Sequence, residues 1–184
     1  MRWWFAVVLF GCNKQDKVDV DNQVDITDYL GLDEDRAWTY RADGGSGPPP
    51  TTENLLRARL VNGETFDIRR GGRWADGDSE IRFTYVVDSH FRFADWRIPG
   101  ESGNTSLALG FANPVNGQSI SESSWFCSTQ SGALLSTYYG IFDDIVQFDC
   151  EGPAGPSGVY TFARDVGLVH FEGSGIVLDL VAPW

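Results

Sequence analysis

The stretch LLRARLVNGETFDIRR, residues 55–70, decides the fold class. Apolar and polar side chains alternate on both sides of a central Asn-Gly pair, and the apolar positions are Leu56, Ala58, Leu60, Phe66 and Ile68. Alternation at every second residue is typical of a β-strand with one buried face, and Asn-Gly between two such runs is the strongest short-range signal of a hairpin. Residues 55–70 therefore predict two antiparallel strands joined by a tight turn.

The same alternation recurs along most of the chain. Further strands are expected in segments separated by Gly-, Ser- or Pro-rich turns, namely residues 80–87, 90–98, 107–111, 158–164, 166–173 and 176–181. No segment keeps a helical period of about 3.6 residues, so we expect little helix beyond a short piece near Thr27–Leu32. Many short strands between turn signals indicate an all-β domain.

The composition indicates one globular domain that does not bind nucleic acid. The chain has 184 residues, of which 42% are hydrophobic and 14% aromatic, which is enough for a single core rich in strand-forming residues. Its formal net charge of −12 opposes binding to phosphate backbones and to anionic lipid headgroups, since both need clustered Lys and Arg. We therefore expect no nucleic-acid partner.

Residues 1–11 have the layout of a secretory signal peptide. Arg2 supplies the basic start, Trp3–Phe10 an apolar run, and Gly11 the small residue that a cleavage site needs. The apolar run is far shorter than the roughly 20 residues that cross a bilayer as a helix. We therefore assign residues 1–11 to a signal peptide, the alternative being an N-terminal strand with a buried cysteine.

The end of this segment, Leu9-Phe10-Gly11-Cys12, resembles the lipobox of bacterial lipoproteins. The resemblance implies that Cys12 is acylated and becomes the new N-terminus. A small residue before the cysteine fits the peptidase, and the thiol is the nucleophile that accepts the diacylglyceryl group. We therefore expect an exported protein that is anchored by lipid to the bacterial cell envelope, at the outer membrane in preference to the inner one, and faces the periplasm or the cell surface.

Residues 12–28 are rich in acids and poor in apolar side chains, which is typical of a solvated tether. Asp19 and Asp21 match the start of a calcium-binding loop, but the central Gly and the closing acid of such a loop are missing. The sequence therefore divides into a lipidated acidic tether at residues 12–28 and an all-β domain at residues 29–184.

Two cysteines remain once Cys12 is assigned to lipid. An even pair in an exported chain is most simply one disulfide, so we expect a bond between Cys127 and Cys150, the alternative being two separate buried thiols. Their spacing does not match a Cys-x-x-Cys redox motif or a zinc site. Closing a loop of this size stabilises the fold by about 3 kcal/mol in the chain-entropy model.

Four short phrases resemble those of a broad group of bacterial secreted proteins and lipoproteins. They are YLGLDEDRAWTY (29–40), LGFANPVNGQSI (109–120), YGIFDDIV (139–146) and FARDVGLVH (162–170). In the group, the corresponding phrases have forms such as Pro-Leu-x-x-Gly-x-x-Trp-x-Tyr and Gly-Val-Gly-Leu-Val. The resemblance implies an exported single domain with an antiparallel curved sheet or an incomplete barrel, the alternative being a β-sandwich. The group carries no established catalytic residues, so none are implied here.

No arrangement of residues predicts catalysis, a cofactor or a metal site. Asp88-Ser89-His90 contains the residue types of a catalytic triad, but neighbours on a strand point to opposite faces. His90 and His170 have no spacing that indicates a metal ion. Asp143-Asp144 and Asp76-Gly77-Asp78 offer paired carboxylates, as a glycosidase needs, but lie in turn-like contexts where Asp binds its own backbone.

The tryptophans give the one indication of binding. Trp74 and Trp96 are candidates for a surface that stacks on sugars or holds an acyl chain, although most aromatic residues of a β protein fill its core. We therefore expect a non-enzymatic module with a structural or binding role, whose partners are the membrane, through the lipid on Cys12, and an apolar ligand, a glycan or an envelope protein. The alternatives are a hydrolase acting on glycan or lipid, and a carbohydrate-binding module that uses Trp74 and Trp96.

Overall fold

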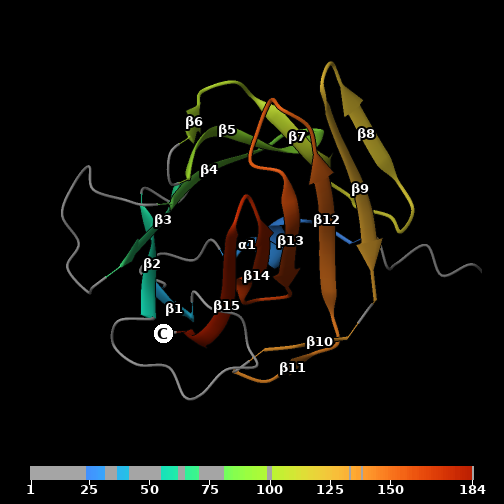
Figure 1. Ribbon diagram of the computed structural model, residues 1–184. Helices are drawn as coiled ribbons and strands as arrows, with labels where there is room; N and C mark the ends of the chain where they lie inside the picture. The colour runs from blue at the N-terminus through green and yellow to red at the C-terminus, as the bar shows by residue number, and fades with distance from the viewer. Residues whose placement is uncertain are drawn as a thin grey trace, which may run out of the picture.

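The computed structural model describes residues 24–31, 37–41, 55–61, 65–70, 81–98, 101–132, 134–137 and 139–183. In these ranges one short helix, α1 (Thr27–Leu30), precedes fifteen β-strands (Figure 1). The strands are β1 (Ala37–Arg41), β2 (Leu55–Val61), β3 (Thr65–Arg70), β4 (Ile81–Val87), β5 (His90–Ile98), β6 (Glu101–Gly103), β7 (Leu107–Phe111), β8 (Ser119–Glu122), β9 (Trp125–Ser131), β10 (Leu135–Ser136), β11 (Ile141–Phe142), β12 (Ile145–Glu151), β13 (Gly158–Ala163), β14 (Gly167–Gly173) and β15 (Ile176–Pro183). The prediction of a single all-β domain with little helix is confirmed.

Thirteen of the strands form one antiparallel sheet in the order β6-β5-β4-β3-β2-β1-β15-β14-β13-β12-β9-β8, and β7 also pairs with β5. The remaining two, β10 and β11, pair only with each other. The hairpin predicted from residues 55–70 is confirmed by the pairing of β2 with β3, in which Leu60 lies opposite Phe66 and Val61 opposite Thr65. The Asn62-Gly63 turn between them lies outside the described residues.

The sheet curls until its two ends meet (Figure 1), and side chains rather than a strand ladder join them. The Ala108 N–H in β7 donates to Glu122 Oε2 of β8 at 3.3 Å, and the Ala108 carbonyl accepts from the Trp125 indole N–H at 2.9 Å. Arg92 adds a salt bridge to Glu122, with Nη1 and Oε1 3.1 Å apart. Among the described strands no ladder joins these ends, so the fold is a continuous curved sheet that is not closed into a barrel.

Aromatic side chains fill the inner face of the curve. Their rings lie close together, with centroids 5.0 Å apart for Phe83 and Phe93 and 4.7 Å apart for Tyr160 and Phe171. The largest fully buried members are Trp38, Trp125, Tyr29, Tyr40, Tyr160, Phe83, Phe91, Phe93, Phe148 and Phe162. Burying one large apolar side chain contributes about 1.5–3 kcal/mol, so this face is the hydrophobic core.

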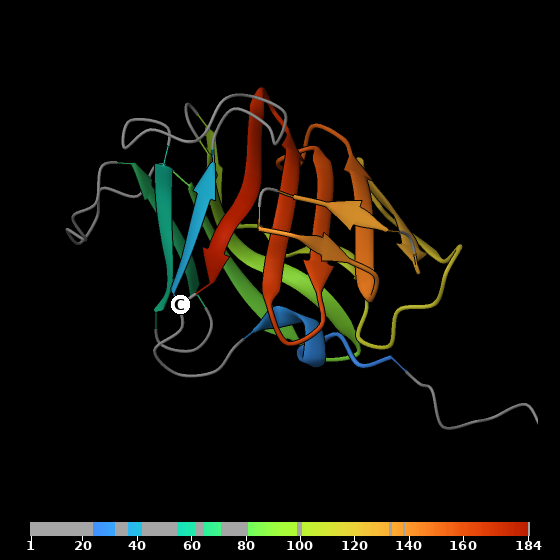
Figure 2. The same cartoon turned by 90° about the horizontal axis from the view of Figure 1, so that it is seen from below.

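The helix α1 packs against β13 and β14, next to the turn that joins them (Figure 2). It ends at Gly31 in the left-handed conformation (φ 61°), where a Cβ would lie 2.7 Å from the Val166 carbonyl oxygen, so glycine is required there. Ile26 is completely buried in the core, and its N–H donates to the Ala112 carbonyl. Ile26, within the segment expected to be a tether, therefore packs against the domain. No helix within the described ranges is long and apolar enough to cross a membrane.

Candidate functional site

The outer face of β8, β9 and β12 carries the candidate site. The sequence of β9, WFCSTQS, alternates so that Trp125 and Cys127 point inward and are buried, while Phe126 points outward and is 38% exposed. The cross-strand neighbours of Phe126 are Ser121 in β8 and Glu151 in β12. A hydroxyl, an exposed aromatic ring and a carboxylate therefore lie in one row across three strands. We call these three residues the Phe126 site.

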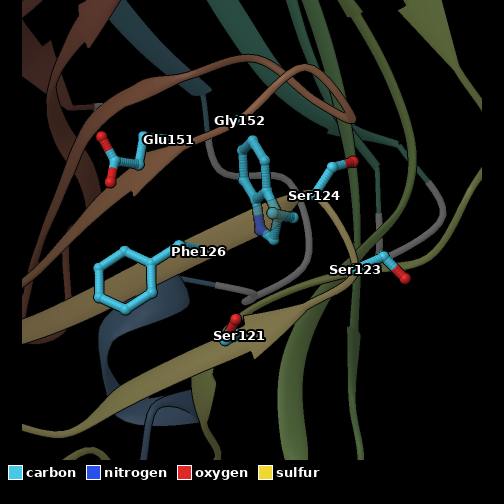
Figure 3. A pocket seen from close by; sticks show the side chains of 7 residues that line it. Ser121, Ser123, Ser124, Phe126, Glu151 and Gly152 are labelled. Atoms are coloured by element: carbon cyan, nitrogen blue, oxygen red, sulfur yellow. The ribbon is translucent and has the colours of Figure 1, made fainter.

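A shallow cavity of about 280 Å³ lies at this row (Figure 3). Its lining comes from β8, from the turn that follows, from the start of β9 and from the end of β12 with the next residue; the residues are Ser121, Ser123, Ser124, Trp125, Phe126, Glu151 and Gly152. Figure 3 shows the Phe126 ring flanked by Ser121 and Glu151, with Ser123 and Ser124 on the turn beside it. The indole of Trp125 belongs to the core, since it is 1% exposed and bonded to Ala108.

The backbone around the cavity is held on two sides. A Cβ on Gly152 (φ 135°) would lie 1.9 Å from the Ser124 carbonyl oxygen, so only glycine lets the two loops approach this closely. Ser157 fixes the same turn, because its hydroxyl accepts from the Gly152 N–H at 3.0 Å and donates to the Gly152 carbonyl at 2.9 Å. The strands thus present Phe126 on a rigid support.

The disulfide predicted between Cys127 and Cys150 is confirmed. The two cysteines are directly opposite each other in the β9–β12 ladder, on the inner face. Cys127 follows Phe126 in the sequence, and Cys150 precedes Glu151. The bond therefore links the two strands that carry Phe126 and Glu151. Because both sulfurs are buried, the cysteines serve the support of the site and not its chemistry.

The residue types at the Phe126 site suit a neutral saccharide. An exposed aromatic face packs against the apolar C–H face of a sugar ring, as aromatic residues do in ligand sites. A carboxylate such as that of Glu151 can accept hydrogen bonds from two sugar hydroxyls, and a hydroxyl such as that of Ser121 can donate or accept one. In a chain with a net charge of −12, a neutral ligand is favoured over an anionic one.

A second polar group lies on the outer face of β13, β14 and β15. Thr161, His170 and Asp179 are successive cross-strand neighbours, and His170 Nδ1 lies 2.6 Å from Asp179 Oδ1. These residue types match those of a nucleophile, a base and an orienting acid. However, Thr161 is fully buried, so no substrate reaches it, and its hydroxyl has no hydrogen-bond partner among the described residues. The group is therefore a partly buried ion pair beside a buried hydroxyl.

Asp88 and Ser89 form the turn between β4 and β5, and His90 is the first residue of β5, so only His90 lies on a strand as expected. Ser89 Oγ lies 3.0 Å from His90 Nδ1, and the Asp88 carboxylate accepts the His90 backbone N–H at 2.7 Å. That backbone hydrogen bond is the main reason why the pKa of Asp88 is lowered. In a triad the acid binds the second ring nitrogen, whereas Asp88 lies 3.9 Å from the same Nδ1 that faces Ser89. The three residues therefore stabilise the turn.

Asp144 is engaged in an ion-pair network that joins α1 to the sheet. Its carboxylate accepts the Tyr29 hydroxyl at 2.5 Å and Arg164 Nε at 2.6 Å, and Arg164 also donates to Asp28 at 2.8 Å. The Tyr29 hydroxyl is the main reason why the pKa of Asp144 is lowered, while burial and Asp144 raise the pKa of Tyr29 to about 12. A glycosidase acid needs a raised pKa, so Asp144 fits a structural role.

The remaining predicted positions divide into two groups. Trp96 is 5% exposed and lies against Gly103 across the β5–β6 ladder, so it does not form the ligand surface predicted for it. The lipidation position Cys12, the second surface candidate Trp74, and Asp76 and Asp78 lie outside the described residues. The sequence analysis did not identify Phe126 as a site residue. The alternation in WFCSTQS contains the signal, because Phe126 points outward if its neighbour Cys127 points inward to a disulfide.

Within the described ranges, no three His, Cys, Asp or Glu side chains gather in a way that would hold a metal ion. No protein-family model matches the chain, and neither curated proteins nor solved structures give a significant match to it. The Phe126 site and the chemistry of its neighbours therefore carry the functional argument.

Proposed function

We propose that this protein is an exported, lipid-anchored, non-enzymatic module that binds a neutral glycan of the cell envelope at the Phe126 site. The observation that carries the proposal is the row formed by Ser121, Phe126 and Glu151, in which a 38% exposed aromatic ring lies between a hydroxyl and a carboxylate. A few polar groups beside an aromatic ring, held on the strands of a sheet, suit the recognition of a ligand.

The packing of the inner face indicates that a ligand binds on the outer face of the sheet. The concave face of the sheet is rich in aromatic side chains, but Phe83, Phe93 and Tyr160 are fully buried and pack against one another. They fill the space that an apolar ligand would need. A ligand therefore meets the protein on the outer face, where Phe126 is accessible.

The engaged state of the candidate acids supports a non-enzymatic role. Asp144 is bound by Tyr29 and Arg164, and Asp179 by His170, so neither carboxylate is available to protonate a leaving group or to attack a sugar. A hydrolase needs one carboxylic acid that stays protonated and a second carboxylate nearby. The lowered pKa of Asp144 is opposite to the first requirement.

The lipobox-like residues 9–12 and the acidic segment after them support the anchor and the export. Mass spectrometry of the protein extracted from membranes tests this part by itself. The expected N-terminal peptide begins at an acylated Cys12. An N-terminal peptide that still contains residues 1–11 would contradict the lipoprotein assignment and leave the Phe126 site untouched.

The binding test uses the chain from residue 12 with Cys12→Ser, which removes the acylation position and leaves every described residue unchanged. Titration calorimetry with neutral oligosaccharides, such as glucans, mannans, chitin oligomers and peptidoglycan glycan fragments, is expected to show binding to at least one class. Phe126→Ala should weaken it by about tenfold or more, because one central aromatic contact commonly exceeds 1.4 kcal/mol. Phe126→Trp, which keeps an aromatic face, should retain it.

Val86→Ala provides the matched control. Val86 is 41% exposed, an exposure similar to that of Phe126, but it lies on β4, which contributes no residue to the lining of the cavity. Its removal should leave glycan binding unchanged. Equal loss in both variants, or an unchanged affinity in Phe126→Ala, would contradict the proposal. Release of shortened oligosaccharides during incubation would instead favour the hydrolase.

A further inference from the structure

His170 and Glu172 lie two residues apart on β14, so their side chains point to the same face of the sheet. This is the outer face, because Phe171 between them is fully buried in the core. His170 Nε2 lies 3.9 Å from Glu172 Oε2. We call these two residues the His170 pair. An imidazole nitrogen and a carboxylate oxygen are both donor atoms that bind zinc in proteins.

Asp179 orients the imidazole ring of the pair. Its Oδ1 lies 2.6 Å from His170 Nδ1, and Asp179 is only 4% exposed. An ionised carboxylate accepts hydrogen bonds and donates none, so the proton of this contact lies on Nδ1. In the neutral ring, Nε2 then carries a lone pair on the side of Glu172. Metal-binding histidines almost always have this arrangement, in which a carboxylate or carbonyl holds the other ring N–H.

The spacing of the His170 pair fits a tetrahedral zinc ion. Bonds of about 2.1 Å at the tetrahedral angle place two ligand atoms about 3.4 Å apart. The Glu172 side chain is 69% exposed, so rotation about its own bonds closes the small difference from 3.9 Å. The same exposure leaves the other coordination positions to water. Two protein ligands hold the ion, in keeping with the absence of a three-residue cluster from the described ranges.

The charges around the pair favour a cation. The strands from β8 to β15 contain no Lys or Arg, and Arg164, which follows β13, pairs with Asp28 and Asp144. Among the described residues, Glu172 therefore has no cationic partner other than His170. The net charge of −12 also attracts cations to the chain as a whole. A nitrogen and an oxygen donor together suit zinc better than calcium or magnesium, which prefer oxygen ligands alone.

We propose that His170 and Glu172 bind one zinc ion on the outer face of β14, with Asp179 as the positioning residue and water as the remaining ligands. The inference goes beyond the proposed glycan binding and does not depend on it, because the Phe126 site lies on β8, β9 and β12. The spacing between the two histidines gave no indication of this site, since the second ligand is a carboxylate two residues from His170.

Nitrogen NMR of the imidazole rings, during titration of the Cys12→Ser chain from residue 12 with zinc chloride, tests the proposal. The chain has two histidines, so His90→Ala assigns both sets of signals. We expect a saturable shift of the His170 Nε2 signal at one zinc ion per chain. Glu172→Gln should raise the dissociation constant by about tenfold or more, and Asp179→Asn by about 10–100-fold, as is typical of residues that orient a ligand.

His90 is the matched control within the same spectrum. Its Nδ1 lies 3.0 Å from Ser89 Oγ and 3.9 Å from Asp88 Oδ1, so no carboxylate holds its ring as Asp179 holds that of His170. Its signals should not move at the zinc concentration that saturates His170. Equal shifts of both histidines would indicate an adventitious ion only and overturn the proposal. An unshifted His170 signal, or an affinity that Glu172→Gln leaves unchanged, would overturn it too.

The fold and the proposed function can be separated from this result. Glu172 is exposed, so the circular dichroism spectrum of Glu172→Gln should match that of the wild type. Phe126→Ala should bind zinc as the wild type does, and Glu172→Gln should keep its glycan binding. Loss of zinc binding in Phe126→Ala would contradict a site made by His170 and Glu172 alone.

Discussion

Trp125 and Phe126 are neighbours in β9, yet the structure uses them in different ways. Trp125 is 1% exposed and its indole joins β9 to β7 through the Ala108 carbonyl, whereas the Phe126 side chain has no hydrogen-bonding group and Phe126 is 38% exposed. The inner residue closes the curve of the sheet, and the outer one is available to a ligand. Successive side chains of a strand point to opposite faces, so Trp125 stabilises the fold while its neighbour Phe126 is available for binding.

The same contrast extends over both faces of the sheet. Inside, aromatic rings contact one another and are buried; outside, Phe126 and Ile141 leave apolar surface open to water. Substitutions on the inner face should reduce the free energy of unfolding. Substitutions at the outer positions should change binding at nearly constant stability. An inner substitution that leaves the free energy of unfolding unchanged, or an outer one that lowers it strongly, would contradict this comparison.

The largest loss of stability is expected from Phe162→Ala. Phe162 is fully buried, and its ring lies 5.5 Å from that of Phe91 and 6.1 Å from that of Phe148. Truncating a core Phe removes apolar contacts and leaves a cavity, which costs about 3–5 kcal/mol. Urea denaturation followed by circular dichroism measures the loss, with Val86→Ala as the exposed control. A loss below about 1 kcal/mol would mean that the inner face is not the core.

The second loss concerns the disulfide that links β9 to β12. The double variant Cys127→Ser, Cys150→Ser releases a loop whose ends are 23 residues apart and should lower the free energy of unfolding by about 3 kcal/mol. Denaturation of the wild type with and without a reducing agent should reproduce this difference. The double variant itself should not respond to the reductant. Equal stability of oxidised and reduced wild type would contradict a stabilising bond.

Local patterns predicted the parts of the fold that depend on neighbouring residues. The alternation in residues 55–70 was sufficient for the β2–β3 hairpin, and the even pair Cys127 and Cys150 for the disulfide. The hairpin follows from the short-range spacing of apolar residues, and the disulfide follows because only two cysteines remain once Cys12 is assigned to lipid. The strand class of most segments was predictable for the same reason.

Contacts between distant segments were beyond the reach of those patterns. Nothing near Arg92 indicates that its guanidinium meets Glu122 across the meeting ends of the sheet, because that contact depends on the curvature of the whole sheet. Trp96 was a candidate for an exposed ring, and its burial against Gly103 depends on the pairing of β5 with β6. Phe126 was accessible to reasoning only once Cys127 had been assigned to the inner face.

A smaller loss, of about 1 kcal/mol, is expected from Tyr29→Phe, which removes the hydroxyl that donates to the Asp144 carboxylate and accepts from Arg164 Nη2. The pKa of Asp144 is lowered in the folded state, mainly by this hydroxyl, so the contribution is present above the unfolded pKa of Asp and is lost as the pH falls through the folded pKa. Urea denaturation at pH 7 and at decreasing acidic pH should therefore show the two proteins converging. Asp143→Asn, at the exposed neighbouring carboxylate, should not reproduce this behaviour; a difference that stays constant with pH would contradict the assigned cause.

The smallest effect on stability is expected from Phe126→Ala. Its ring is already 38% exposed in the folded state, and its cross-strand neighbours, Ser121 and Glu151, offer it little apolar surface. Substitutions at such positions usually change the free energy of unfolding by no more than about 0.5 kcal/mol. A core-like loss of several kcal/mol, measured by the same urea denaturation, would show that Phe126 belongs to the packing of the sheet. If Phe126→Ala leaves the free energy of unfolding nearly unchanged and abolishes glycan binding, the exposed ring contributes to binding and not to stability. The need for a ligand contact would then explain why β9 exposes an apolar ring to water.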